Sequence, residues 1–179
     1  MSLVSHHTIS LDGYVAGPDD EVEWSFEYGS ATSLAEETMV RIGAIVAGRR
    51  WYELALERWN GVDGIYGGSF DGRVFVVTHH PPEESGGARI TFVSSGVEDA
   101  VAEAARTAAG KDVGVFGGSL TQQCLRAGLL DEIVLHVVPV LLGGGVRLFD
   151  EIGARVELSR VSVAAAEQVT DLRFRVLRR

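Results

Sequence analysis

Two short apolar runs in this chain pass directly through glycine into a segment with helical patterning, and this repeated order constrains the fold most. The first run covers residues 44–47 and ends at Gly48. The second covers residues 112–116 and ends at the pair Gly117 and Gly118. A buried strand that leads into a helix is the unit of a parallel sheet, because the helix carries the chain back across the sheet. We therefore expect an α/β fold.

The remaining patterns extend this sheet and close it with an antiparallel pair. Ser33 with Glu36, and Ser95 with Glu98, have the spacing of a capping box at a helix start. The two long runs near the C-terminus can pair as a hairpin around Glu167. The expected strands are 4–9, 44–47, 73–78, 89–93, 112–116, 133–138, 156–165 and 169–177, and the expected helices are 33–42, 49–56, 95–110 and 120–127. The sheet should be parallel in the middle, with strands 73–78 and 89–93 central, and antiparallel at its C-terminal edge.

The composition indicates one folded domain, and we expect residues 1–179 to form it. Of the residues 46% are hydrophobic, which supports a core without disulfides. The single Cys124 cannot form an internal disulfide, which favours a reducing compartment, and we expect a cytoplasmic protein. No apolar run approaches the roughly 18 residues of a membrane span, so no membrane partner is expected.

The charge of the chain bears on its partners. With 16 basic and 25 acidic residues the net charge is −9, which is unfavourable for binding a nucleic-acid backbone. An anionic partner should therefore be a small molecule met by a local cluster. No metal site is expected, because the histidines of the pairs at 6–7 and 79–80 are adjacent in strands and point to opposite faces.

The double glycine is the first candidate binding motif. Without a Cβ, Gly117 and Gly118 let the backbone approach a ligand closely, and the following helix start offers free N–H groups to a phosphate. The alternative is a tight strand-to-helix turn with nothing bound. The run matches neither the P-loop nor the G-x-G-x-x-G pattern, so its spacing alone does not decide between these alternatives.

Two arginines mark the second corner. Arg49 and Arg50 follow Gly48 at the expected helix start, where positive charge is unfavourable unless an anion compensates it. An arginine pair can hold a terminal phosphate, which would favour NADPH over NADH. The alternative is a solvated pair bonded to Glu53 or Glu57.

Several segments together resemble a known family. They include "ISLDGYVAG", "AIVAGRRWYE", "VFVVTHHP" and "VGVFGGSLTQQCLRAGLLDEIVLHVVPVLLGGGVRLF". In order and spacing they are similar to the dihydrofolate reductase-like superfamily, in the branch of the riboflavin-biosynthesis reductase (RibD C-terminal domain). The resemblance spans nearly the whole chain. It implies a three-layer α/β/α fold with a mixed, mostly parallel twisted sheet, NADPH as hydride donor and a homodimer.

The resemblance also implies which residues contact the cofactor. In the family, the two glycine corners hold opposite parts of NADPH. The matching positions are Gly48, Arg49 and Arg50 for the 2′-phosphate and diphosphate, Thr78 and His79 for the adenosine ribose, Gly117, Gly118, Ser119 and Leu120 for the diphosphate, and Val15 and Ala16 for the nicotinamide.

Two departures from the family pattern concern the substrate. Thr32 stands where dihydrofolate reductases carry a carboxylate, and Phe116 stands where riboflavin-pathway reductases usually carry an acidic residue. The primary hypothesis is reduction of a small heterocycle related to 5-amino-6-(5-phosphoribosylamino)uracil. The alternatives are a pterin reductase, and a dimeric nucleotide-binding module of the same fold without turnover.

Further residues are candidates around the substrate. Hydride transfer requires a proton as well, and Asp12, beside the expected nicotinamide loop, is the candidate catalytic acid. The alternative for Asp12 is a turn residue that caps its own backbone. Competing acids lie in or near the segment that would cover the substrate, namely Asp19, Asp20, Glu23, Glu27 and Glu36. Trp24 is the candidate aromatic side chain of the substrate pocket, although ordinary packing explains it as well. His136, between apolar neighbours in a strand, is expected as a core or interface histidine. Residues 133–142 are expected to form the dimer contact, because a long apolar strand would otherwise be exposed.

Overall fold

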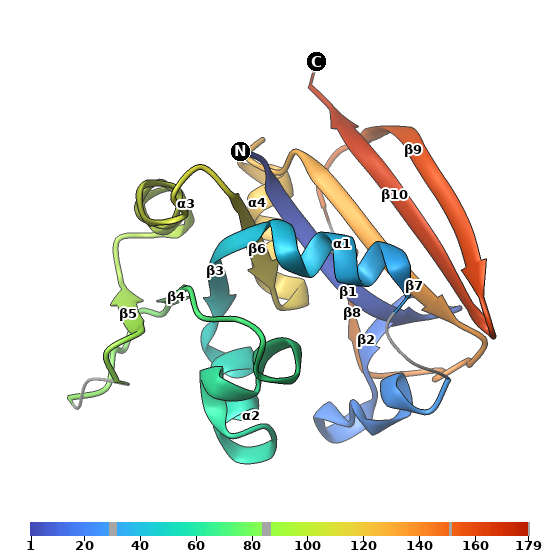
Figure 1. Cartoon of the computed structure of the whole chain (residues 1–179), viewed down its shortest axis with the longest axis horizontal. Coiled ribbons are helices and arrows are strands. Elements are labelled where there is room, and N and C mark those ends of the chain that lie inside the picture. Colours follow the sequence, from blue (N-terminus) through green and yellow to red (C-terminus); the bar gives the residue numbers. More distant parts are fainter. Residues whose placement is uncertain (29–31, 84–86, 151, 179) are drawn as a thin grey trace.

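Strands that are distant in sequence lie side by side in one mixed sheet (Figure 1). The computed structural model describes residues 1–28, 32–83, 87–150 and 152–178, and within them eight strands form this sheet in the order β5-β4-β3-β6-β1-β7-β10-β9. The strands are β1 (Leu3–Ser10), β3 (Ile42–Gly48), β4 (Arg73–Val77), β5 (Ile90–Val93), β6 (Asp112–Phe116), β7 (Glu132–Val138), β9 (Glu157–Ala166) and β10 (Val169–Leu177).

Strand direction follows the sequence expectation. β1, β3, β4, β5, β6 and β7 pair in parallel, whereas β10 pairs antiparallel with both β7 and β9. The hairpin between β9 and β10 turns at Glu167, whose φ is 52°. The prediction of a sheet that is parallel in the middle and antiparallel at its C-terminal edge is confirmed.

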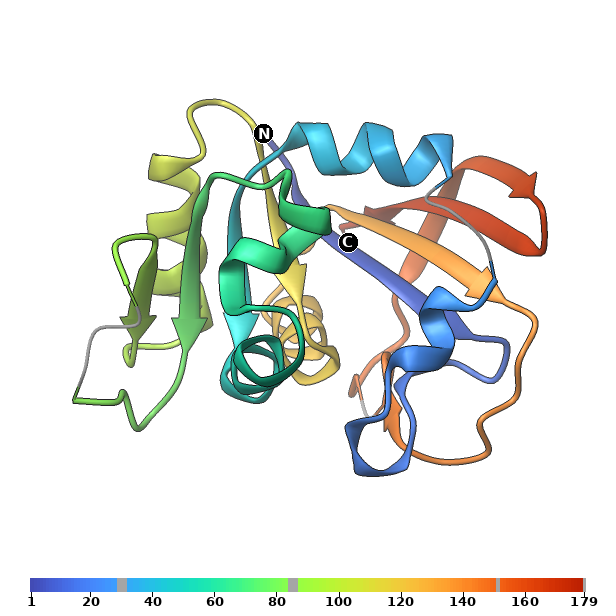
Figure 2. The same ribbon diagram turned by 60° about the horizontal axis from the view of Figure 1, so that its bottom comes forward.

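Helices cover both faces of the sheet. Successive side chains of β3 point to opposite faces and are buried on both, so both faces must be covered. Ile45 points to the face of α1 (Ser33–Arg41) and α2 (Arg49–Arg58), and packs in one cluster with Tyr52 of α2. Val46 points to the other face, where it packs with Ala104 of α3 (Val97–Thr107) and Cys124 of α4 (Gly118–Arg126). Figure 2 shows α1 and α4 on opposite sides of the sheet. The result is the expected three-layer arrangement.

Several expected boundaries need correction. α1 is capped by Thr32 rather than by Ser33, because the Thr32 side chain accepts the hydrogen bond from the amide of Ala35 (3.1 Å). α3 begins after Gly96, which offers no side-chain cap, so the capping box expected at Ser95 is wrong. α4 begins at residue 118, two residues earlier than expected.

Two further segments differ from expectation. β5 lies at the edge of the sheet and not in its middle, because only β4 pairs with it among the described strands. The glycine-rich segment between expected helix 49–56 and expected strand 73–78, to which the sequence analysis assigned neither helix nor strand, contains the short 3₁₀ helix η3 (Gly61–Gly68). Two more 3₁₀ turns, η1 (Pro18–Asp20) and η2 (Glu23–Phe26), lie in the N-terminal loop.

The sheet opens between β1 and β6. β1 pairs with β6 only through its first residues, up to Ser5, whereas it pairs with β7 along Val4–Ser10. From His6 onward, β1 therefore has no strand partner on its β6 side. This parting lies at the carboxyl ends of the parallel strands, where open α/β sheets bind their ligands.

A second, two-stranded sheet lies near this opening. β2 (Tyr14–Ala16) pairs antiparallel with β8 (Val146–Arg147), which ties the loop after β1 to the segment after β7. Their close approach requires glycine at position 145, where φ is +117° and a Cβ would lie 2.2 Å from the carbonyl oxygen of Ala16.

The apolar strand expected as a dimer surface lies inside the molecule. β7 is flanked by β1 and β10, and Ile133, Val134 and Leu135 are buried. The exposure argument for residues 133–142 is therefore wrong for the strand itself. None of the helices in the described ranges has the length and apolar character to cross a membrane.

Replacing Thr32 with alanine is expected to lower the free energy of unfolding by about 1 kcal/mol, because the amide of Ala35 loses its acceptor. Urea denaturation followed by circular dichroism measures the change. Ser33→Ala is the matched control, since Ser33 is exposed and lies one residue inside the helix. A larger loss in Ser33→Ala than in Thr32→Ala would contradict the assigned cap.

Candidate active site

A cavity of about 640 Å³ lies where the parallel strands β3, β4 and β6 end, and we call it the corner cavity. Its size is in the range of cofactor and ligand pockets. Every position that the sequence assigned to NADPH lines it. These residues are Val15, Ala16, Gly48, Arg49, Arg50, Thr78, His79, Gly117, Gly118, Ser119 and Leu120.

The double glycine gives this cavity its anion-binding character. Gly117 has a φ of +99°, which favours glycine, and a Cβ on Gly118 would lie 2.8 Å from the carbonyl oxygen of Arg147. No side chain caps α4 in the described structure. Gly118 and Ser119 line the cavity, so the start of α4, with the partial positive charge of a helix N-terminus, lies at its edge. This geometry suits a phosphate.

The two arginines of the other corner both have carboxylate partners. Arg49 Nε donates to Glu53 Oε1 (2.6 Å), and another of its nitrogens donates to the carbonyl of His80. Arg50 Nε donates to Asp20 Oδ2 (2.8 Å). The alternative of a carboxylate-bonded pair is thus realised, with Asp20 in the place of Glu57. Both residues line the corner cavity all the same, at the start of a helix with no acidic residue in its first turn.

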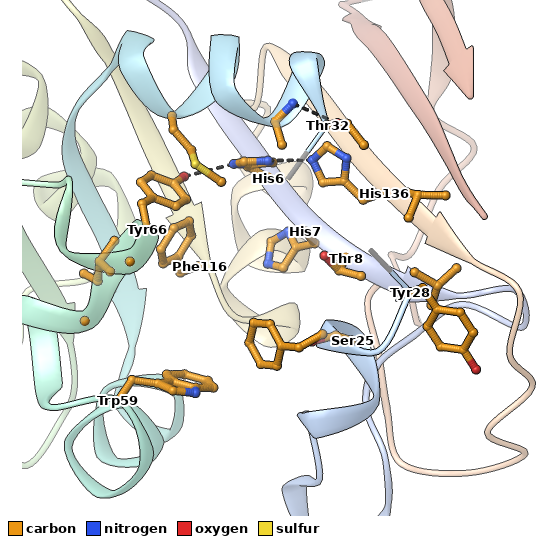
Figure 3. Close-up of a pocket in the computed structure, with 18 of the residues that line it drawn as sticks. His6, His7, Thr8, Ser25, Tyr28, Thr32, Trp59, Tyr66, Phe116 and His136 are labelled. Atoms are coloured by element: carbon orange, nitrogen blue, oxygen red, sulfur yellow. Dashed lines mark hydrogen bonds between the residues drawn. The ribbon is translucent and has the colours of Figure 1, made fainter. Parts of the chain in front are cut away.

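A second cavity of about 620 Å³ adjoins the first and lies below α1; we call it the inner cavity. Aromatic rings from several elements line it (Figure 3). The residues that line both cavities are His6, His7, Thr8, Ser25, Phe26, Trp51, Trp59 and Phe116. Thr32 and Phe116, the two departures from the family pattern, both line the inner cavity.

A chain of hydrogen-bonded side chains reaches from this cavity into the sheet. The Tyr66 hydroxyl lies 2.9 Å from His6 Nδ1, and His6 Nε2 lies 2.7 Å from His136 Nε2. His136 Nδ1 lies 2.6 Å from Asp171 Oδ1. His6, His136 and Asp171 are all buried. We call these four residues the histidine chain.

Burial controls the protonation of the histidines on β1. Burial first, and the neighbouring imidazole of His136 second, lower the pKa of His6 well below its usual value. The same two causes lower the pKa of His7 to about 4. Burial raises the pKa of Tyr66. At neutral pH, His6 and His7 are therefore uncharged and Tyr66 keeps its proton.

Sequence reasoning identified only part of this arrangement. His136 is the buried, hydrogen-bonded histidine that its apolar neighbours predicted. Its pairing with His6 was missed, and so were Tyr66 and Asp171. The available signal is a register argument: His136 lies opposite Thr8 on the neighbouring strand, so it shares a face with His6. That argument needs the strand order, which no local pattern reveals.

Trp24 does not line either cavity. It is buried, its indole nitrogen donates to the carbonyl of Glu21 (3.0 Å), and it packs with Val138 and Val169. This position corrects the expectation that Trp24 contacts a substrate. Among the aromatic residues of the same loop, Phe26 and Tyr28 do line the inner cavity.

Asp12 bonds the loop that follows β7. Its carboxylate accepts hydrogen bonds from the Ser10 hydroxyl (2.6 Å) and from the amides of Leu142 (3.1 Å) and Gly143 (2.8 Å). The bond from Ser10, followed by those from the two amides, lowers the pKa of Asp12 to about 2. Asp12 is thus ionised at neutral pH, and it is not among the residues that line the two cavities. Its catalytic role stays a prediction that these contacts do not favour.

A mixed sheet of this strand order, with helices on both faces, is a dihydrofolate reductase-like α/β fold. The RibD C-terminal domain model matches residues 2–171, and the chain belongs to that family. The expected resemblance is therefore confirmed.

Two curated relatives from Bacillus subtilis (strain 168) are similar over most of their length. The chain is 22% identical to the uncharacterized protein YwjB over 173 residues, which cover 96% of this chain and 95% of YwjB. It is 26% identical to the uncharacterized protein YyaP over 171 residues, which cover 86% of this chain and 83% of YyaP.

Solved structures share the fold. A candidate riboflavin biosynthesis protein from Shewanella sp. PV-4 matches with a TM-score of 0.84 and 23% identity, over 99% of this chain and 100% of that chain. The Thermotoga maritima deaminase and 5-amino-6-(5-phosphoribosylamino)uracil reductase matches with a TM-score of 0.67 and 14% identity, over 98% of this chain and 56% of that one. The riboflavin biosynthesis reductase Rib7 of Saccharomyces cerevisiae matches with a TM-score of 0.63 and 12% identity, over 98% and 90%.

His7 is expected to make the protein less stable in mild acid. The unfolded chain takes up a proton at His7 near pH 6.5, whereas the folded chain does so only near pH 4, so stability falls as the pH decreases between these values. His7→Gln should reduce this fall by about 3 kcal/mol between pH 7 and pH 4, as measured by urea denaturation. His79→Gln is the control, because His79 is exposed. Equal pH dependence in His7→Gln and the unmodified protein would refute the expectation.

Proposed function

We propose that the chain is an NADPH-dependent reductase that transfers a hydride to a small heterocyclic compound. The observation that carries the proposal is that one cavity collects both glycine corners and all the residues assigned to the cofactor. When bound, NADPH supplies the hydride. The chain's own residues bind the cofactor, orient it and exclude water from the reacting centre.

The residues of the corner cavity fit the chemistry of this cofactor. The amides at the start of α4 would hold the diphosphate, and Arg49 and Arg50 would hold the 2′-phosphate. A phosphate would compete with Glu53 and Asp20 for these guanidinium groups. A dianionic 2′-phosphate carries more charge than either carboxylate, which supports a preference for NADPH over NADH.

The inner cavity supports a flat heterocyclic substrate. It adjoins the corner cavity, and Trp51, Trp59 and Phe116 line both. Aromatic walls favour a planar ring system, which they can contact face on or edge on. We propose a substrate related to the phosphoribosylamino-uracil named for the Thermotoga maritima neighbour. A pterin is the alternative, for which Thr32 offers a hydroxyl and no carboxylate.

A second candidate is a nucleotide-binding module of the same fold without turnover. The observation that favours it is the apolar side chain of Phe116 beside the double glycine, where related reductases carry an acid. Binding of NADPH without its oxidation by uracil or pterin substrates would support this module. Saturable oxidation with either substrate would exclude it.

Removing both cofactor arginines is expected to weaken NADPH binding far more than NADH binding. Loss of charge-assisted hydrogen bonds to a phosphate costs on the order of 1.5–3 kcal/mol, so Arg49→Ala with Arg50→Ala should raise the NADPH dissociation constant roughly tenfold to a hundredfold. Nicotinamide fluorescence measures both cofactors. Arg58→Ala is the matched control, because Arg58 lies on the same helix, pairs with Glu23 and lines neither cavity. Absence of NADPH binding at millimolar concentration would overturn the proposal.

We also propose that the protein is a cytoplasmic homodimer. The buried, unpaired thiol of Cys124 supports a reducing compartment. Exposed apolar side chains on the edge strand β9, including Val161 and Val163, support contact with a second copy of the chain. Light scattering at micromolar concentration is expected to give twice the 19.2 kDa mass of one chain. A mass of one chain would contradict the dimer.

A further inference from the structure

The histidine chain joins four elements that are distant in sequence. Tyr66 comes from η3, His6 from β1, His136 from β7 and Asp171 from β10. The distances between consecutive partners are 2.9, 2.7 and 2.6 Å, so the hydrogen-bonded path is continuous. Figure 3 shows the part of this path that joins Tyr66, His6 and His136. Three of the four residues line the inner cavity, namely Tyr66, His6 and His136. Asp171 does not line it and forms the buried end of the path.

With both imidazoles neutral, the donors and acceptors of this path have one consistent order. Asp171 Oδ1 accepts from His136 Nδ1–H, which leaves His136 Nε2 as an acceptor. His6 Nε2–H then donates to His136 Nε2, and His6 Nδ1 accepts from the Tyr66 hydroxyl. In this state the hydroxyl hydrogen of Tyr66 points away from the cavity.

One additional proton reverses the order. With His136 doubly protonated, its Nε2–H donates to His6 Nε2, and His6 carries its proton on Nδ1. His6 Nδ1–H then donates to the oxygen of Tyr66, whose own hydrogen becomes free to point into the inner cavity. His6 stays neutral in both states, in agreement with its lowered pKa. The charge of the additional proton is balanced by the carboxylate of Asp171.

Few ionisable groups outside this path line the inner cavity, and among them the His7 imidazole contributes to the lowered pKa of His6. Apart from its own members, the titratable residues that line the inner cavity are His7 of β1 and Tyr28 of the N-terminal loop. His7 bonds to Ser5 (3.0 Å) and to the amide of Gly117, on the opposite face of β1. α1 and its N-cap residue contribute only uncharged side chains to the cavity, namely Thr32, Ala35 and Met39.

Tyr66 is held in position by an unusual backbone. Its φ and ψ are 52° and 41°, the left-handed region that a bulky side chain rarely adopts and that costs on the order of 1–3 kcal/mol. Its ring packs edge-on against Phe70 and Phe116. The turn also depends on Gly64, where a Cβ would lie 1.8 Å from the carbonyl oxygen of Trp59. The fold thus fixes the hydroxyl between His6 and the cavity.

We propose that the histidine chain is a proton relay that delivers a proton to a compound in the inner cavity through the hydroxyl of Tyr66. This inference rests on the proposed reductase function. It specifies the substrate as an imine or carbonyl compound whose nitrogen or oxygen lies beside Tyr66.

The proton and electron balance is complete. The hydride from a reduced nicotinamide adds to the carbon of the C=N or C=O bond, and the proton from Tyr66 adds to the nitrogen or oxygen. Tyr66 regains a proton from His6 Nδ1, and His6 regains one from His136 through Nε2. The chain returns to its neutral state and takes up one proton from solvent before the next cycle.

Histidine NMR tests the relay without any substrate. In the full-length protein labelled with ¹⁵N-histidine, long-range ¹H–¹⁵N correlation identifies which ring nitrogen carries the proton. As the pH is lowered, His136 should become doubly protonated, and at the same midpoint His6 should move its proton from Nε2 to Nδ1 while staying neutral. A His6 that keeps its Nε2 proton when His136 is charged would overturn the relay.

Removal of the buried counter-charge gives the second test. Asp171→Asn should lower the midpoint of the shared transition by at least one pH unit, a tenfold change in proton affinity. Asp63→Asn is the control, because Asp63 is exposed and pairs with Arg89. An unchanged midpoint in Asp171→Asn would contradict the assigned counter-charge and with it the relay.

Turnover separates the relay from the reductase proposal. With NADPH and 5-amino-6-(5-phosphoribosylamino)uracil or a dihydropterin, Tyr66→Phe should lower kcat roughly 10²- to 10⁴-fold and leave the NADPH dissociation constant unchanged. Tyr52→Phe is the matched control, a buried tyrosine outside both cavities. Full turnover by Tyr66→Phe would overturn the relay while the reductase stands. Absence of turnover in the unmodified protein would refute the reductase, and the NMR transition would still decide the relay.

Discussion

The parting of β1 from β6 is the constraint on which the rest of the structure depends. β1 has partners on both sides only as far as Ser5, and beyond that point its β6 side is free. Backbone N–H and C=O groups without a strand partner need other hydrogen-bond partners, or they line a cavity that water or a ligand can enter. At this parting, His7 meets the amide of Gly117 and His6 meets Tyr66. Both cavities and the histidine chain lie around this one discontinuity.

The opposite end of the same strands is closed by charged groups. Arg41 binds Asp112 (2.9 Å from Nε) and Glu132 (3.2 Å from Nη1), and Arg173 binds Glu132 as well. These partly buried pairs connect α1 and β10 to the residues at which β6 and β7 begin. Once one partner of such a pair is buried, loss of the other is strongly destabilising. The sheet is thus fixed at its amino ends and open at its carboxyl ends, which lets a cavity form without loosening the core.

The sequence was sufficient to predict the features that depend on neighbouring residues. Apolar runs and glycines located the eight strands of the large sheet, both corners and the C-terminal hairpin, because strand propensity and the flexibility of glycine are local properties, whereas the short strands β2 and β8 were missed. The cap of α1 was shifted by one residue, because Thr32 and Ser33 can both serve and only the structure shows which side chain faces the amide. The edge position of β5 and the burial of Trp24 depend on partners distant in sequence.

The histidine chain was beyond local prediction for a related reason. His6 and His136 are 130 residues apart, and Asp171 lies 35 residues further on in a strand of opposite direction. Each of them looks ordinary in its own segment. Their convergence requires the order β1-β7-β10, together with a glycine-rich turn that brings Tyr66 over the sheet. Pairing between strands that are distant in sequence is not evident from any local sequence pattern.

The common lining of the two cavities affects how two ligands would be accommodated. His6, His7, Trp51, Trp59 and Phe116 face both spaces, so the boundary between them is not made by the polypeptide alone. A ligand bound in one cavity would therefore form part of the lining of the other cavity. The first ligand to bind would then change the surface that the second ligand contacts. The shared lining therefore couples the selectivity of the two cavities to the order in which the ligands bind.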